Sequence, residues 1–306
     1  MRKAVILFLA LCGSGVLHAQ DAARYRALAD SAFHLYEQQA YAASARTYAS
    51  AFQAFGGNGS WNDRYNAACS WALAGSPDPA FEQLELIAAL PDYTEVDLLT
   101  SDTDLQSLHA DPRWVPLVAA VRANKEKREA NYDKPLVALL DSLHRMDQDL
   151  RQQSDAVEQR YGHGSAEMQA HWKRIRSTDS SNQVVVTRIL DERGWLGDDV
   201  VGPQGASTLF LVIQHADLPV QEKYLPMMRE AVAQGRASGS SLALLEDRVR
   251  MRQGLPQRYG SQVGRETDTG AYYLIALEDP DHVDERRAAV GLQPLADYLR
   301  NWNLTW

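Results

Sequence analysis

The sequence predicts an all-α protein in which repeated helical hairpins are followed by a compact helical domain, with at most one short strand or hairpin. Two observations lead to this expectation. Residues 24–54 and 60–90 have the same arrangement of small and large side chains, and apolar residues recur at helical spacing through most of the remaining chain. Seven tryptophans and thirteen tyrosines are typical of a well-filled core and not of disorder.

The chain begins in the way that secretory signal peptides begin. Arg2 and Lys3 precede an apolar run over residues 4–11, and small residues follow up to Ala19. We therefore expect residues 1–19 to be removed and the protein to be exported, either to the periplasm or out of the cell. No later stretch approaches the roughly 20 apolar residues of a membrane helix, so no transmembrane segment is expected.

The cysteines and the charge balance narrow the classes of function. Alternatively, the signal peptide ends before Cys12, and this cysteine carries a lipid anchor. Leu11 argues against this alternative, because a small residue usually precedes a lipid-modified cysteine. Otherwise Cys69 is the only cysteine that remains, and no internal disulfide is expected. The chain has 31 basic and 40 acidic side chains and no basic stripe, which argues against nucleic acid as its partner.

The two similar segments are expected to form stacked helical hairpins. Small residues such as Ala32 and Ser44 fall where paired helices must approach closely, and Tyr48 falls where the next layer packs. This spacing resembles the tetratricopeptide repeat. The resemblance implies a solenoid with a concave surface, and therefore a protein or peptide partner for this half of the chain.

A helix that starts near Trp114 is expected to close the repeats, and a charged stretch up to Glu129 follows it. The sequence thus predicts a repeat region over residues 20–130 and a second domain over residues 131–306. In the second domain, caps and apolar spacing predict helices separated by a less regular stretch at 161–178 and by a short strand at 271–277. The expected helices cover residues 135–153, 181–193, 206–216, 220–233, 241–253, 281–290 and 294–302.

His215 is the first candidate catalytic residue, because it ends the apolar helix at 206–216. The helix dipole favours its charged form, and Asp217 or Asp247 would orient it or help to hold a metal, which together would make a hydrolase-type site. A single clear histidine argues against zinc, and the sequence contains no recognisable metal or cofactor motif. Alternatively, His215 only caps the carbonyls at the end of the helix.

Two further groups are candidates for ligand binding. Asp247 and Arg248 lie beside the apolar residues that are expected to face the core on the helix at 241–253. They suit a catalytic or ligand-binding role, and they suit equally well a buried ion pair that holds two helices together. Tyr259 and Gln262 belong to a polar loop of the kind that lines pockets. Alternatively, Tyr259 fills the core and Gln262 satisfies backbone groups.

Residues 135–302 resemble a bacterial domain family of unknown function. The matching stretches are LFLVIQHAD (209–217), QEKYLPMMREAV (221–232), ALLEDRV (243–249), QRYGSQ (257–262) and VDERRAAVGLQPLADYL (283–299). Ser261 stands where the family typically has threonine. The resemblance implies a helical fold and no particular activity. It places the family's recurring polar residues at Gln148, Arg151, His215, Asp217, Asp247, Arg248, Tyr259 and Gln262, and Gln214 beside His215 is a further candidate for ligand binding.

Two functions are therefore expected as alternatives. The first is an exported cell-envelope protein that binds a protein or peptide through its repeat half. The second is a hydrolase-type enzyme in which His215 acts with Asp217 or Asp247.

Overall fold

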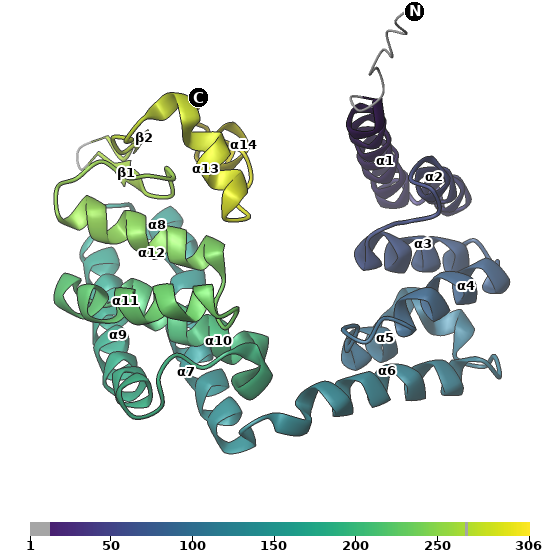
Figure 1. The fold of residues 1–306 in the computed structure, drawn as a ribbon, viewed down its shortest axis with the longest axis horizontal. Coiled ribbons are helices and arrows are strands. Elements are labelled where there is room, and N and C mark those ends of the chain that lie inside the picture. Colours follow the sequence, from purple (N-terminus) through teal and green to yellow (C-terminus); the bar gives the residue numbers. More distant parts are fainter. Residues whose placement is uncertain (1–12, 267–268) are drawn as a thin grey trace, which may run out of the picture. The chain divides into compact units, whose positions relative to one another are not determined.

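The structure is a computed structural model that describes residues 13–266 and 269–306, and nearly all of its regular structure is helical (Figure 1). The expectation of an all-α fold is confirmed. Most of the expected signal peptide, including Cys12, lies outside the described residues. Across the described part of the chain, no helix combines the length and the apolar character that crossing a membrane requires. Internal contacts divide the chain into two compact units, one ending at Ala130 and the other running from Asn131 to Trp306.

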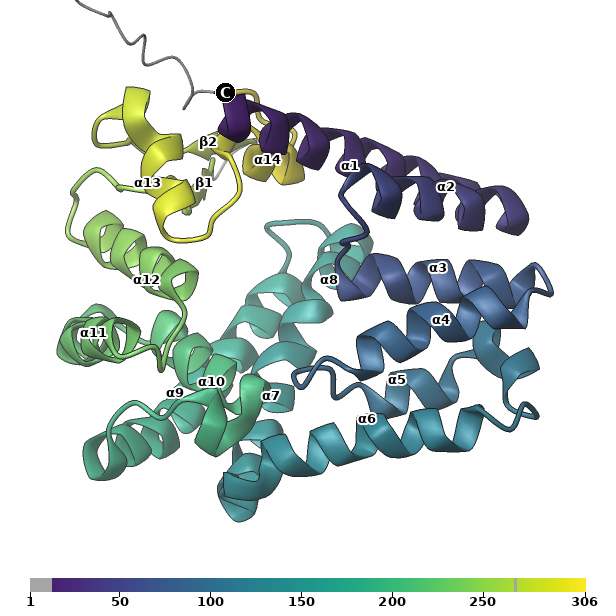
Figure 2. The same cartoon turned by 45° about the vertical axis from the view of Figure 1, so that its right-hand side comes forward.

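The first unit is a succession of packed helices. Its elements are α1 (Gly13–Glu37), α2 (Tyr41–Ala54), α3 (Trp61–Leu73), α4 (Pro77–Ala88), α5 (Val96–Ser101), the 3-10 helix η1 (Thr103–Leu108), α6 (Trp114–Arg128) and the 3-10 helix η2 (Glu129–Asn131), whose last residue belongs to the second unit. Each of the first three helices packs against the next, and α4 also packs against α6 (Figure 2). Ser44 shows how closely they approach, because its hydroxyl donates to the Ala32 carbonyl of α1 at 2.8 Å and lies 2.9 Å from the Ser70 hydroxyl of α3.

The second unit is a helical domain with one small hairpin. Its elements are α7 (Lys134–Gln152), α8 (Ser154–Tyr161), α9 (Ala166–Arg193), α10 (Asp198–His215), α11 (Leu218–Ala233), α12 (Gly239–Arg252), β1 (Val263–Arg265), β2 (Tyr272–Leu274), the 3-10 helix η3 (Pro280–His282), α13 (Val283–Ala289), α14 (Leu295–Leu299) and the 3-10 helix η4 (Arg300–Trp302). Helices α7, α9 and α10 pack against one another, and α11 packs on α12. The antiparallel strands β1 and β2 pair Val263 with Leu274, so the expected strand has a partner.

Helix α9 differs from the expectation in its length and in its start. The stretch at 161–178 was expected to be less regular, but most of it belongs to this helix. Ser165 caps α9 by accepting the Met168 backbone N–H at 3.0 Å. Ser181, the expected cap, lies inside the helix and donates its hydroxyl to the Ser177 carbonyl. The helix is continuous because a buried stripe at helical spacing runs beneath its polar surface, and its members are Met168, His171, Ile175, Asn182, Val186 and Ile189.

Helix α10 carries His215 at its end and has a kink near its start. Gly202 has a φ of 70°, a conformation that glycine adopts without steric cost. A Cβ at this position would lie 3.2 Å from the Tyr132 ring. Pro203 then restarts the helix at a position where the missing N–H of proline is tolerated. The segment after the kink is mostly buried, and it brings His215 to Asp147 of α7.

The close packing of α2 predicts different responses at two alanines one helical turn apart. Ala45 is fully buried, whereas Ala49 is exposed. We expect Ala45→Leu to lower the free energy of unfolding by about 1–3 kcal/mol, because added methylenes force neighbouring helices apart. The matched variant Ala49→Leu should change it by less than about 0.5 kcal/mol. Urea unfolding of both variants measures the difference, and equal stabilities would contradict the packing described here.

Candidate functional site

His215 forms a dyad with a buried carboxylate. Its Nδ1 lies 3.0 Å from Oδ1 of Asp147, a residue of α7 that is 1% exposed. An ionised carboxylate only accepts hydrogen bonds, so Nδ1 carries a proton and donates it. Among the described residues, none forms a hydrogen bond with Nε2, and the His215 side chain is 16% exposed. The ring is therefore fixed on one side and available on the other.

Three side chains keep the Asp147 carboxylate ionised. Besides His215, Gln148 donates its amide to Oδ2 at 2.7 Å, and the Arg151 guanidinium lies 3.2 Å from Oδ1. Burial raises the pKa of Asp147, but the hydrogen bond from His215, the charges of His215 and Arg151 and the hydrogen bond from Gln148 outweigh it, so the pKa lies below its usual value. Asp147 is therefore a fixed negative charge at neutral pH.

Arg151 links this dyad to α9. Its second terminal nitrogen donates to both carboxylate oxygens of Asp179, at 2.8 and 2.9 Å. Asp147, Asp179 and His215 bring oxygen and nitrogen atoms within 4.8 Å of one another, a spacing that could hold a metal ion. The guanidinium of Arg151 already bridges the two carboxylates, however, and supplies the positive charge that an ion would bring. The geometry therefore favours an ion-pair network over a metal centre.

Arg248 and two amides lie beside the end of α10. The Arg248 Nε donates to Oε1 of Gln262 at 2.5 Å, and one of its terminal nitrogens lies 3.5 Å from the Gln214 carbonyl. The side-chain amides of Gln214 and Gln262 both reach the Leu244 carbonyl, at 3.4 and 3.5 Å. Six of the residues that the sequence singled out thus form two groups that meet at the end of α10: Gln148 and Arg151 with His215, and Arg248 and Gln262 with Gln214.

Asp247 has a different place. Its side chain is fully buried and accepts the backbone N–H groups of Arg258, Tyr259 and Ser261, at 2.7 to 3.2 Å. The loop after α12 is thereby fixed to the helix. No hydrogen bond joins Asp247 to His215 or to Arg248 among the described residues.

Among the described residues, Asp217 and Tyr259 likewise form no hydrogen bond with the dyad. Asp217 caps α11, where its Oδ1 accepts the Val220 N–H at 3.3 Å. Tyr259 is buried, and its hydroxyl lies 3.4 Å from a carboxylate oxygen of Glu246. The carboxylate that forms a hydrogen bond with the imidazole of His215 is that of Asp147, and not that of Asp217 or Asp247.

Sequence reasoning missed Asp147 and Asp179, although each carried a signal. On α7, Asp147 continues the buried stripe of Leu136, Leu140 and Leu143 at helical spacing. On α9, the half-buried Asp179 lies at helical spacing between the buried Ile175 and Asn182. A carboxylate at an otherwise apolar position is costly unless it has a partner, which makes it a candidate for a site.

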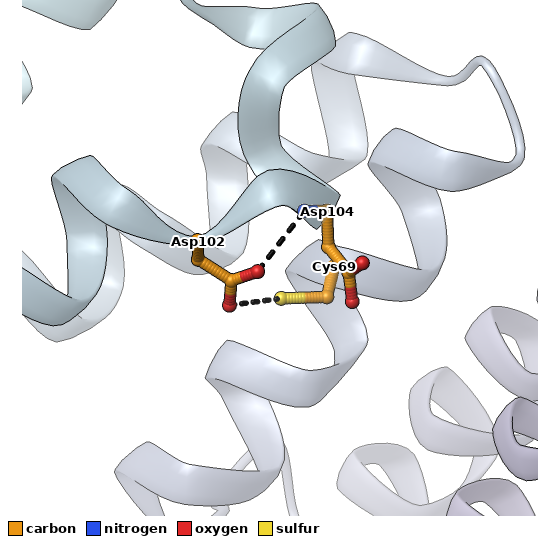
Figure 3. Close-up of side chains that lie close together, drawn as sticks. All are labelled: Cys69, Asp102 and Asp104. Atoms are coloured by element: carbon orange, nitrogen blue, oxygen red, sulfur yellow. Dashed lines mark hydrogen bonds between the residues drawn. The ribbon is translucent and has the colours of Figure 1, made fainter.

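A second group of potential metal ligands lies in the first unit (Figure 3). The buried Cys69 thiol donates toward Asp102, whose carboxylate also accepts from the Tyr65 hydroxyl at 2.9 Å and from the Asp104 backbone N–H at 3.0 Å. Asp104 in turn accepts from the Tyr36 hydroxyl. Burial and the two carboxylates raise the pKa of the Cys69 thiol, which is therefore protonated at neutral pH. These bonds join α1, α3 and η1, and they account for the group as a structural one.

The role of Asp247 as a loop anchor can be tested by its amide variant. We expect Asp247→Asn to lower the free energy of unfolding by about 2–4 kcal/mol, because an amide nitrogen would meet buried N–H groups and the charge-assisted bonds would be lost. Asp281→Asn is the control, since Asp281 is exposed. Chemical denaturation followed by circular dichroism measures both, and a destabilisation below about 1 kcal/mol would refute the anchoring role.

Comparison with known proteins leaves the site geometry as the main guide to function. No curated protein and no solved structure matches the chain. One protein family does match, described as "Family of unknown function (DUF6624)", and the match covers residues 134–305, which is more than half of the chain and nearly all of its second unit. The chain belongs to this family of unknown function, DUF6624.

Proposed function

We propose that the second unit is an acid–base enzyme of the hydrolase type, with His215 as the proton-transferring group. The observation that supports this most directly is the dyad, in which Nδ1 of His215 is held by buried Asp147 while Nε2 has no partner among the described residues. An imidazole in this state takes a proton from water and later returns it to a leaving group.

Asp147 acts as a positioning residue in this proposal. Its hydrogen bond selects the tautomer that carries the proton on Nδ1, so the lone pair of Nε2 faces the reactant. Its negative charge stabilises the imidazolium that forms when Nε2 accepts a proton. Gln148 and Arg151 hold the carboxylate in turn, so the ring and its partner keep their geometry without substrate.

The residues around the dyad suit the activation of water. The unit offers no cysteine nucleophile, because Cys69 lies in the first unit. Direct attack by a water molecule that His215 deprotonates needs only the base and a group that binds the substrate. Arg248 and Gln262, which lie beside the end of α10, supply polar groups of that kind.

This function predicts that hydrolysis depends on one histidine among several. With a panel of chromogenic carboxylic esters, phosphate esters and peptide amides, we expect turnover of at least one class. His215→Gln should lower kcat by about 10²–10⁴-fold, because the general base is lost. Asp147→Asn should lower kcat as well, through loss of the tautomer and of the charge.

The control for this experiment is His282→Gln. His282 is exposed and paired with Asp279, away from the dyad, so its replacement should leave turnover unchanged. Thermal unfolding of every variant separates loss of chemistry from loss of fold. Turnover that survives His215→Gln at the wild-type rate would eliminate the proposal, as would the absence of turnover of every class.

We further propose that the chain is exported and that its first, tetratricopeptide-like unit binds a peptide. The basic and apolar start of the sequence supports export. A largely apolar groove of about 500 Å³ between α4 and α6 supports peptide binding. Its lining includes Ala89, Pro116, Leu117 and Ala120. Such a surface suits an apolar side chain of an extended or helical peptide.

A peptide that uses this groove should be excluded by a bulky charge inside it. We expect peptides selected from a displayed library against the full chain to bind at least tenfold more weakly to Ala120→Arg. Ala119→Arg places the same charge on the neighbouring exposed residue, which does not line the groove, and should bind as wild type does. Fluorescence anisotropy measures the affinities. Equal binding to both variants would argue against the groove.

A further inference from the structure

Arg248 is a partly buried positive charge without a negative partner. Its two hydrogen bonds go to neutral acceptors, the Gln262 side-chain oxygen and the Gln214 carbonyl. Within the described residues, no carboxylate forms an ion pair with it. By contrast, Arg250 on the same helix pairs with Glu278 at 2.6 Å, and Arg151 pairs with two aspartates. The difference singles out Arg248 among its neighbours.

The surroundings of Arg248 add further positive charge. Burial first, and then the nearby charges of Arg252 and Arg151, lower the pKa of Arg248 to about 10. The guanidinium is still charged at neutral pH, so the folded chain bears an electrostatic cost that a bound anion would remove. Arg252 adds to this positive charge, and its own guanidinium donates to a neutral group, the Ala216 carbonyl.

The polar network beside Arg248 is also incomplete. Gln214 is 4% exposed, and its Oε1 accepts no hydrogen bond from the described residues. Buried polar atoms in native proteins usually have partners. The unsatisfied Oε1 needs a donor, such as a hydroxyl of a bound molecule, and does not itself attract an oxyanion. It lies on the residue that precedes His215, and the backbone carbonyl of the same residue contacts the uncompensated Arg248.

We propose that Arg248 is the receptor for the oxyanion of a small ligand, a carboxylate or a phosphate group, which it holds beside His215. This inference rests on the proposed function and deepens it, because it names the substrate class of the same site. A guanidinium presents N–H donors in a plane that matches such oxyanions. The Gln262 oxygen fixes that plane through the Nε bond, and one terminal nitrogen also lies 3.5 Å from the Gln214 carbonyl, which leaves the other terminal nitrogen to meet the ligand.

Two simple anions test the receptor in the full chain. We would titrate the protein with sodium phosphate and with sodium acetate at a constant ionic strength set by sodium chloride, and follow the thermal midpoint and the dissociation constant by calorimetry. A ligand that binds only the folded state raises the midpoint in proportion to its occupancy. We expect at least one anion to do so, and the preferred one identifies the ligand group as phosphate or carboxylate.

Variants on one helix provide the comparison. Arg248→Gln should weaken anion binding at least tenfold, whereas Arg250→Gln should bind as wild type does, because the Arg250 charge is already neutralised by Glu278. Arg248→Lys, which keeps the charge and loses the planar fork, should bind with intermediate affinity and covers the case in which the glutamine variant does not fold. In chloride alone, we expect Arg248→Gln to unfold at no lower temperature than wild type.

The outcomes separate this inference from the proposed function. If anions bind in a way that depends on Arg248 but the protein shows no turnover, the receptor role of Arg248 is supported and the acid–base function is refuted. If turnover depends on His215 but neither anion binds, the role of Arg248 as an anion receptor is refuted and the acid–base function stands. The receptor is likewise overturned if neither anion shifts the midpoint, or if Arg248→Gln retains wild-type affinity.

Discussion

The burial of the Asp147 carboxylate is the constraint on which the second unit depends. A charge removed from water is stable only when other groups replace its solvation, and here these groups come from its own helix and from α10. Arg151 extends the connection to Asp179 on α9. The contacts that stabilise this charge thus also fix the relative positions of three helices. They leave His215 with a defined orientation and a free ring nitrogen.

The unit contains a second buried carboxylate, and the comparison shows why the residue type alone does not indicate a role. Asp147 faces side chains that can exchange protons and carry charge. Asp247 faces backbone N–H groups, which have no such chemistry. The difference comes from what each helix packs against. Asp147 lies on α7, which packs against α8, α9 and α10. Asp247 lies on α12, which packs against α10 and α11, and its side chain meets the irregular loop that follows α12.

The all-α fold could be predicted from local patterns, because apolar spacing, caps and breakers act over a few residues. The start of α9 was misplaced because Ser165 and Ser181 are both good caps, and only the buried stripe between them decides. The choice of His215 followed from its place at the end of an apolar helix. Its partner could not be predicted in that way, because Asp147 lies 68 positions earlier and the two meet only when α7 packs on α10. That Arg248 has no carboxylate partner likewise could not be predicted, because it depends on which side chains tertiary packing brings near the guanidinium.

The loop after α12 lacks regular structure, yet its backbone is bonded on both sides. Besides the N–H groups held by Asp247, the carbonyls of Arg258, Tyr259 and Ser261 accept from Arg286, Arg287 and Tyr298. Gln257 bonds both backbone groups of Gln262. A segment held in this way has little conformational entropy left to lose when a ligand arrives. Association at this face then requires no ordering of the loop, and selectivity comes from the shape that the folded chain already has.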